Sequence, residues 1–284
     1  MSTTEIQALE EYELFCDGRL ADPYPLFHRL RSEDPVHWSE RLDSWVLTRY
    51  DDVRAATRDR RFSSDRASVP MSALSETDRT RLRPLGEHVS NWLGFTDPPK
   101  HTRMRNMVSK TLTQELAEDM RARIQQIVDT LIDDADLQGR MDLVSDFAYP
   151  LPSILICEIL GVPEGDRGRF KTWVDDIAAF VGGVGPYAMR AAEQADASRK
   201  ELTRLFRELT LERRREPRED LISALAAVEG EEEGLTEQEL LGLSVFLFVA
   251  GHETTVSLIS NGMLSLLQNR DELERLRLDP SLME

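Results

Sequence analysis

Apolar residues run almost without interruption from Leu235 to Gln268. They fall on every side of a helix with about 3.6 residues per turn, and a helix of that kind lies in the middle of a protein. Thr236 and Glu239 stand at the spacing of a capping box, which predicts where the helix begins. The run between charged residues is too short to cross a bilayer. We therefore expect a buried central helix.

The rest of the pattern predicts mainly helices separated by Pro and Gly. Helical periods cover residues 26–32, 51–59, 115–135, 152–160, 166–181, 187–215, 220–228 and 271–278. Another helix begins at Asp97-Pro98-Pro99. Residues 36–38 and 45–48 are typical of two strands joined by a turn, residues 139–147 are strand-like, and the polar stretch 62–95 is typical of a long loop. This indicates a mainly α fold with a small N-terminal β-hairpin.

Polar residues interrupt the central helix at Ala250-Gly251-His252-Glu253-Thr254-Thr255. Gly costs about 1 kcal/mol relative to Ala inside a helix, and a buried carboxylate costs more unless it is paired or protonated. Gly251 would let a flat group approach the backbone, and Thr254 could bond to the carbonyl of Ala250 and bend the helix. With Glu253, this predicts a short proton path. A structural helix with both threonines satisfied by backbone bonds explains the spacing about equally well.

His101 and Arg105 are four residues apart, so they share one face of the helix that follows Pro98-Pro99. Both donate hydrogen bonds and can carry positive charge, which suits a bound pair of carboxylates. Taken alone, the pair is better explained as a solvated basic face, by roughly 4:1.

Composition narrows the classes of function. The 284 residues hold 35 Lys and Arg against 52 Asp and Glu, and the net charge of −17 disfavours nucleic acid as a partner. Cys16 and Cys157 are too few for a disulfide framework or a Cys metal site, which fits a reducing cytoplasm. The N-terminus has neither a basic nor an apolar signal region, so we expect no membrane anchor.

These motifs resemble those of the cytochrome P-450 family, the haem-thiolate monooxygenases. Residues 250–255 resemble the family's oxygen-activation motif, small-Gly-any-acid-Thr-Thr/Ser, and His101 with Arg105 resembles its His-x-x-x-Arg element. Segments within residues 24–65 also resemble the bacterial soluble members, so the resemblance covers essentially the whole chain.

The resemblance implies a haem-dependent monooxygenase that binds haem b and inserts one oxygen atom of O₂ into a small organic substrate. Electrons would come ultimately from NAD(P)H through a ferredoxin-type partner, and the protein would be cytoplasmic. Arg103 and Lys110 would form a local basic patch that steers this partner. The loops Ser63–Asn91 and Val181–Tyr187 would roof the substrate pocket.

The resemblance also implies roles for individual residues. Thr254 would hydrogen-bond the oxygen held over the haem, and Glu253 would feed protons to it. The other implied site residues are His101 and Arg105 at the haem propionates, Ala250, Gly251 and Thr255 beside the haem, and Phe246 and Val249 in the substrate wall.

Three elements that follow the central helix in the family do not occur before Glu284: a helix with Glu-x-x-Arg, a β-rich region and the loop whose cysteine binds iron. Neither Cys16 nor Cys157 matches that cysteine. We therefore expect residues 1–284 to form a single incomplete haem-monooxygenase domain, truncated after the central oxygen-binding helix. Without the axial cysteine it could be inactive as it stands.

Two other functions are open to this sequence. His252-Glu253 could begin the zinc motif His-Glu-x-x-His, but position 256 is Val256, so we set a zinc hydrolase aside. The alternative that remains is a non-catalytic helical binding or scaffold protein derived from the P-450 fold.

Overall fold

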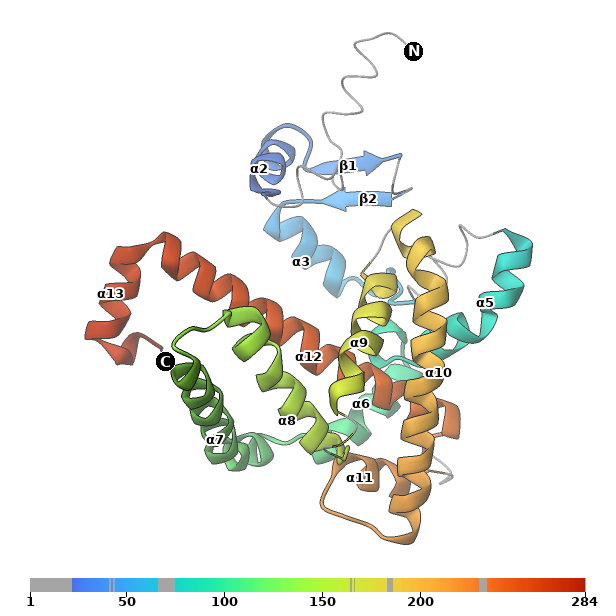
Figure 1. The fold of residues 1–284 in the computed structure, drawn as a ribbon. Coiled ribbons are helices and arrows are strands. Elements are labelled where there is room, and N and C mark those ends of the chain that lie inside the picture. The colour runs from blue at the N-terminus through green and yellow to red at the C-terminus, as the bar shows by residue number, and fades with distance from the viewer. Residues whose placement is uncertain are drawn as a thin grey trace. The chain divides into compact units, whose positions relative to one another are not determined.

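The computed structural model describes residues 22–40, 42, 44–65, 75–163, 165, 167–182, 186–229 and 234–283. The chain divides into two compact units, Met1–Ser63 and Ser64–Glu284 (Figure 1). The single incomplete domain expected from the sequence stays a prediction.

A two-stranded sheet and two helices make up the described part of the first unit. The elements are α2 (Tyr24–Glu33), β1 (Val36–Ser39), β2 (Ser44–Leu47) and α3 (Tyr50–Arg58). The strands pair antiparallel with Trp38 opposite Trp45, and the two ring centroids are 5.2 Å apart. Aromatic cross-strand pairs of this kind stabilise a short hairpin. The predicted hairpin is confirmed.

The named elements in the described part of the second unit are all helices, and an isolated β-bridge pairs Glu229 with Leu235. Its elements are α5 (Glu76–Val89), η1 (Leu93–Phe95), α6 (Lys100–Thr111), α7 (Gln114–Gln138), η2 (Leu143–Ala148), α8 (Pro150–Leu160), α9 (Arg167–Val181), α10 (Pro186–Arg215), α11 (Leu221–Ala227), α12 (Glu237–Gln268), α13 (Arg270–Leu278) and η4 (Pro280–Met283). The mainly α fold predicted from the sequence is confirmed.

Two local predictions were wrong. The stretch 62–95, expected as a loop, contains α5, which is capped by the Ser75 hydroxyl accepting from the Asp78 amide at 3.1 Å. Helix α5 continues past Pro84 and buries Leu82 and Leu85. The sequence did not predict it because a proline usually ends a helix. The strand-like stretch 139–147 instead forms most of η2, a single wide helical turn. Residues 66–74 of the expected roof loop, and 183–185 of the second one, lie outside the described residues.

The first half of α12 lies in the core, as its apolar pattern predicts. The predicted capping box is present: the Thr236 hydroxyl accepts from the Glu239 amide at 3.2 Å, and the Glu239 carboxylate accepts from the Thr236 amide at 3.0 Å. Phe248 is 1% exposed and stacks on Phe170 of α9, with ring centroids 4.6 Å apart. Gly242 allows α12 to approach the chain after α5, because a Cβ there would lie 2.7 Å from the Asn91 Cβ.

The second half of α12 is exposed, so the expectation of burial on all sides was wrong for it. Leu258 is 73% exposed, Leu264 53% and Leu267 50%. In Figure 1 this half extends away from α9 and α10 toward α13. An apolar pattern indicates that a helix is suited to burial but does not show what buries it. Among the described residues, other elements bury only the first half of α12.

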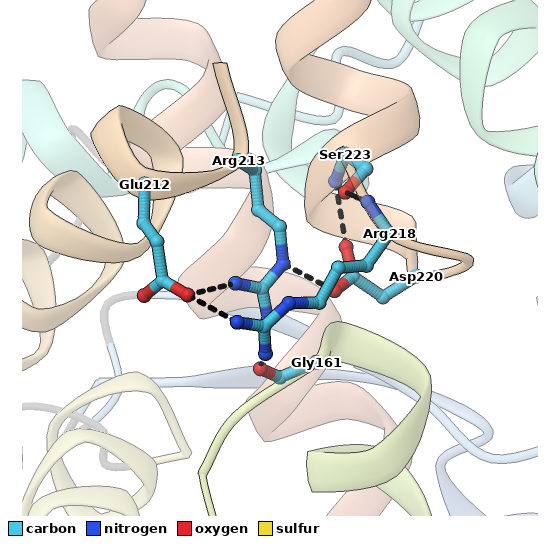
Figure 2. A network of polar contacts seen from close by, with 6 residues as sticks. All are labelled: Gly161, Glu212, Arg213, Arg218, Asp220 and Ser223. Carbon is cyan, nitrogen blue, oxygen red and sulfur yellow. Dashed lines mark hydrogen bonds and ion pairs between the residues drawn. The ribbon is translucent and has the colours of Figure 1, made fainter. Parts of the chain in front are cut away.

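A buried polar network joins the ends of α8 and α10 to the start of α11 (Figure 2). Arg213 is 2% exposed; its Nε donates to the Asp220 carboxylate at 2.5 Å and its Nη2 donates to the Gly161 carbonyl at 2.9 Å. Gly161 has φ of 75°, and a Cβ there would lie 2.1 Å from the Asp220 carboxylate. Only glycine therefore fits at the end of α8.

Two stretches, Leu143–Leu160 and Glu237–Gln268, are long and apolar enough to cross a membrane if single charges within them are tolerated. The charge-free run considered in the sequence is shorter because Glu253 interrupts the second stretch. Helix α8 packs against α7 and α12, and the first half of α12 lies in the hydrophobic core. Core helices meet the same criteria of length and composition, so these two stretches are weak evidence for a membrane span.

Candidate functional site

The predicted oxygen-activation motif lies where α12 passes from buried to exposed. His252 is 1% exposed, whereas Glu253 and Thr254, the next two residues, are exposed. The sequence led us to expect a buried carboxylate at Glu253, and this was wrong. The buried His252 ring packs against Tyr149 at the start of α8, whereas the Glu253 side chain is exposed.

Both threonines of the motif bond to the backbone one turn earlier. The Thr254 hydroxyl donates to the Ala250 carbonyl at 2.8 Å, and the Thr255 hydroxyl donates to the Gly251 carbonyl at 3.0 Å. The predicted Thr254 bond is therefore present. The helix is nevertheless continuous from Glu237 to Gln268. Because Thr254 is exposed, its hydroxyl is free to exchange this bond for another partner.

Gly251 has a packing reason for being glycine. A Cβ at this position would lie 3.0 Å from Cδ1 of Ile156, on the neighbouring helix α8. The missing side chain thus lets α8 approach α12 closely at this position. The expected approach of a flat group to Gly251, and the cofactor contacts of Ala250 and Thr255, stay predictions.

His252 is a residue of the motif that our sequence reasoning assigned no role. Its ring meets the Tyr149 ring edge to face, with centroids 4.3 Å apart, and the Lys171 ammonium lies 4.5 Å from the centroid of the Tyr149 ring. Neither ring nitrogen has a partner with hydrogen-bond geometry among the described residues. Burial lowers the pKa of His252, and the Tyr149 backbone opposes this only in part. His252 is therefore a buried histidine whose lowered pKa favours the neutral ring, packed against Tyr149 at the start of α8.

The second predicted constellation lies on α6. His101 is partly buried and Arg105 is exposed, and neither has a hydrogen-bond or ion-pair partner within the described residues. Their spacing of one helical turn places them on the same face of α6. An unpaired guanidinium next to an imidazole is suited to bind an anionic group that the protein itself does not supply.

Arg103 does not belong to the free basic patch that we expected. Its guanidinium donates to the Glu239 carboxylate at 2.5 Å and also to the Gly234 carbonyl. Burial alone would raise the pKa of Glu239, but the bonds from Arg103 and the Thr236 amide outweigh it and hold this pKa below its usual value. Arg103 therefore anchors α6 to the first turn of α12. Lys110 at the end of α6 is exposed, and its role in steering a partner stays a prediction.

The two constellations are not joined directly. Arg103 contacts α12 at Glu239, and the motif residue Glu253 lies 14 positions further along, about 21 Å at 1.5 Å per residue. No hydrogen bond or ion pair among the described residues connects His101 or Arg105 to residues 250–255.

Phe246 and Val249 lie in the hydrophobic packing around α12. The Phe246 ring centroid is 5.6 Å from that of Trp92, and a Cβ on Gly94 would lie 3.1 Å from the Phe246 ring. Val249 is 8% exposed and belongs to the core cluster. Their predicted place in a substrate wall stays a prediction.

Comparison with known proteins identifies the family. A sequence model of the Cytochrome P450 family matches residues 38–279. The cytochrome P450 monooxygenase PikC of Streptomyces venezuelae is 41% identical over 270 residues, which are 93% of this chain and 61% of PikC. Cytochrome P450 107B1 of Saccharopolyspora erythraea is 36% identical over 290 residues, covering 100% of this chain and 68% of that protein.

Solved structures agree with this result. The structure of P450BioI in complex with acyl carrier protein ligated to hexadec-9Z-enoic acid superposes with a TM-score of 0.84 at 32% identity, covering 93% of this chain and 66% of that one. The myxobacterial cytochrome P450 CYP267B1 in complex with myristic acid gives 0.81 at 38% identity, over 95% and 66% of the two chains. This chain therefore spans about two thirds of the length of the proteins that it matches. The sequence match and the shared helical fold show that the chain belongs to the cytochrome P450 family.

Proposed function

We propose that this protein acts as a haem-dependent monooxygenase. It would insert one oxygen atom of O₂ into an organic substrate, and the other atom would leave as water after uptake of two electrons and two protons. The observation that carries the proposal is the position of Glu253 and Thr254 at the start of the exposed half of α12, in a chain of this family.

Haem is the cofactor of the family, and features of the described residues fit it. The exposed half of α12 presents large apolar side chains, of which Leu258 is 73% exposed. His101 and Arg105 offer unpaired hydrogen-bond donors for the propionates, and Arg can bind a carboxylate with two parallel bonds. Haem, when bound, would supply the activation of oxygen.

The residues of the motif would transfer protons and border the cofactor. Thr254 would turn its hydroxyl away from the Ala250 carbonyl and donate a hydrogen bond to the reacting oxygen atom. Glu253 is exposed, so it can take up protons from water and pass them to Thr254. Ala250, Gly251 and Thr255 would border the cofactor.

The thiolate that would hold the haem iron is proposed to come from outside residues 1–284. Cys157 is 0% exposed within α8, where it packs in the core, and Cys16 lies outside the described residues. Residues 1–284 alone are then expected to bind haem weakly at most and to show no 450 nm band with carbon monoxide after reduction. Such a band from this chain would locate the thiolate at one of its two cysteines.

We infer a mostly apolar organic substrate, of the size of a steroid or a fatty acid. Relatives at 35% and 37% identity are a vitamin D(3) 25-hydroxylase and a 6-deoxyerythronolide B hydroxylase. A related structure contains testosterone and another contains myristic acid. Phe246 and Val249 would contribute to the apolar wall of such a pocket. Electrons would come from NAD(P)H through a ferredoxin-type partner in the cytoplasm.

The test of the proposal is Thr254→Ala in a protein extended with the rest of the family domain. Loss of a proton donor of this kind typically slows a reaction by about 10²–10⁴-fold. We expect electron consumption to continue while product per NAD(P)H falls and peroxide appears. Ser257→Ala removes a hydroxyl from the same exposed half of α12 and is the matched control. Unchanged coupling in Thr254→Ala would remove Thr254 from the mechanism.

A non-catalytic scaffold is the second candidate, and one observation favours it. Both motif hydroxyls are already satisfied by backbone carbonyls, as in a purely structural helix. Expression of the extended protein with haem separates the two functions. An intense Soret band supports the enzyme, and its absence supports the scaffold.

A further inference from the structure

A hollow that the proposed function does not use lies between α7, α8 and α11. Its volume is about 540 Å³, within the range of roughly 300–1,000 Å³ that is usual for small-molecule sites. Five of the eleven residues that line it have apolar side chains, namely Leu116, Met120, Ile159, Leu221 and Ala224. Leu221 and Ile159 are also part of the hydrophobic packing of the unit, so these walls are fixed by the core.

The polar wall of the hollow is held by the network of Figure 2. The Asp220 carboxylate accepts from the Ser223 amide at 2.8 Å, and the Ser223 hydroxyl accepts from the Arg218 amide at 2.9 Å. The buried Arg213 bonds the same Asp220 and the end of α8. The shape of the hollow is thus set before any ligand arrives, which lowers the entropic cost of binding.

Among the charged side chains that line the hollow, one carboxylate has no ion-pair partner within the described residues. Three of the four charged side chains in its lining are held in ion pairs, namely Glu158 with Arg123, Asp220 with Arg213, and Arg218 with Glu212. The fourth is Glu219, which has no hydrogen-bond or ion-pair partner among the described residues. The unpaired charge at the rim of an apolar hollow is therefore negative.

We propose that this hollow binds a small organic cation with an apolar body. The body would lie against Leu116, Met120 and Ile159, and the ammonium group would pair with Glu219. A carboxylate ligand is disfavoured, because it would meet Glu219 while the Arg218 guanidinium is already engaged by Glu212 at 2.7 Å. The site would work independently of haem, because none of its lining residues belongs to the two constellations on α6 and α12.

Calorimetry and saturation-transfer NMR on residues 1–284 without haem test the proposal with two matched probes. These are 4-phenylbutylamine and the neutral 4-phenylbutan-1-ol, which share the apolar body and differ in charge. We expect the amine to bind about two- to fivefold more tightly at low salt, the contribution of one exposed ion pair. Glu219→Gln should remove this preference, whereas Glu216→Gln, an exposed carboxylate outside the hollow, should keep it.

A filling substitution tests the location. Ala224→Phe should abolish saturable binding of both probes, and Thr111→Trp fills the hollow from α6 if the first variant does not fold. Circular dichroism melts establish which variants are folded. The proposal is overturned if the amine shows no saturable binding up to millimolar concentration, if its preference survives Glu219→Gln, or if folded filling variants bind both probes like the wild type.

Discussion

The first half of α12 lies in the core, whereas the second half, from Glu253 onward, is exposed, although both halves are similarly rich in Leu and Val. Phe248 in the first half is 1% exposed and Leu258 in the second is 73% exposed. The same apolar pattern thus has two meanings. In the first half it holds this unit together, and in the second it marks a surface that we assign to haem and to the remainder of the family domain.

The largest expected difference between the halves is in the free energy of unfolding. Phe248→Ala removes a buried ring stacked on Phe170 and should cost about 3–5 kcal/mol. Leu258→Ala removes an exposed side chain and should change stability by less than about 0.5 kcal/mol. Urea unfolding followed by circular dichroism measures both. Equal losses would contradict the assignment of the second half to the surface.

The anchor of the first half should have a smaller effect. Arg103→Met leaves the Glu239 carboxylate, 9% exposed, without its charged partner and should cost about 1.5–3 kcal/mol. Arg83→Met, which breaks an exposed pair with Glu87, is the control and should cost about 0–0.5 kcal/mol. If the two variants lose the same stability, α6 is not anchored through Arg103.

The ion pair between Arg103 and Glu239 should also make the stability of the protein sensitive to acid. The pKa of Glu239 is lowered in the folded protein, so its contribution to stability is present above the unfolded pKa of about 4.3 and is lost as pH falls through the lower folded pKa. Arg103→Met should therefore flatten the dependence of stability on pH below about 4.3. Unfolding measured from pH 5 down to pH 3 tests this, and an unchanged slope would exclude Glu239 as its source.

Each half of α12 contains a glycine whose replacement by alanine tests whether that half is packed against a neighbour. A Cβ at Gly242 would meet Asn91 at 2.7 Å, so Gly242→Ala should destabilise the protein by about 1–2 kcal/mol through overpacking. A Cβ at Gly262 meets nothing within 4 Å, so Gly262→Ala should stabilise it by about 0.5–1 kcal/mol through helix propensity. Thermal melts of the two variants should therefore shift in opposite directions, and shifts of the same sign would break the comparison.

The smallest expected effect lies at the boundary between the halves. Burial lowers the pKa of His252, so the unfolded chain takes up a proton at this residue more readily than the folded protein does. The free energy of unfolding should therefore be highest above about pH 6.5 and should fall as pH drops below that value. His252→Phe keeps the contact with Tyr149 without buried unpartnered nitrogens, and should change stability at pH 7 by less than about 1 kcal/mol. It should also reduce the loss of stability between pH 7 and pH 5. A loss identical to that of the wild type would show that His252 does not titrate with unfolding.

The sequence predicted the helices, the hairpin and the cap of α12 because each depends on residues close together in the chain. The Thr236 and Glu239 capping box and the bond from Thr254 to Ala250 are contacts of this local kind. The pattern missed α5 because Pro84 usually breaks a helix, whereas here the buried Leu82 and Leu85 hold it in place.

Long-range contacts could not be predicted in the same way. Arg103 looked like a free surface cation, and its partner Glu239 lies 136 residues away in sequence. The sequence suggested room for a ligand at Gly251 and could not show that Ile156 on α8 also packs closely there. The hollow beside Glu219 combines side chains of α7, α8 and α11, and no single stretch of sequence shows it.

Hydrogen exchange along α12, measured on residues 1–284 with and without saturating haemin, tests the assignment of the two halves most directly. Covered helices exchange slowly, and uncovered ones open locally. The account predicts slow exchange from Leu240 to Val249 in both states, and faster exchange from Glu253 to Leu267 that slows on adding haemin. Arg105→Ala should weaken this protection. Haemin that binds but leaves Glu253 to Leu267 unprotected, or slow exchange there without haemin, would contradict the account.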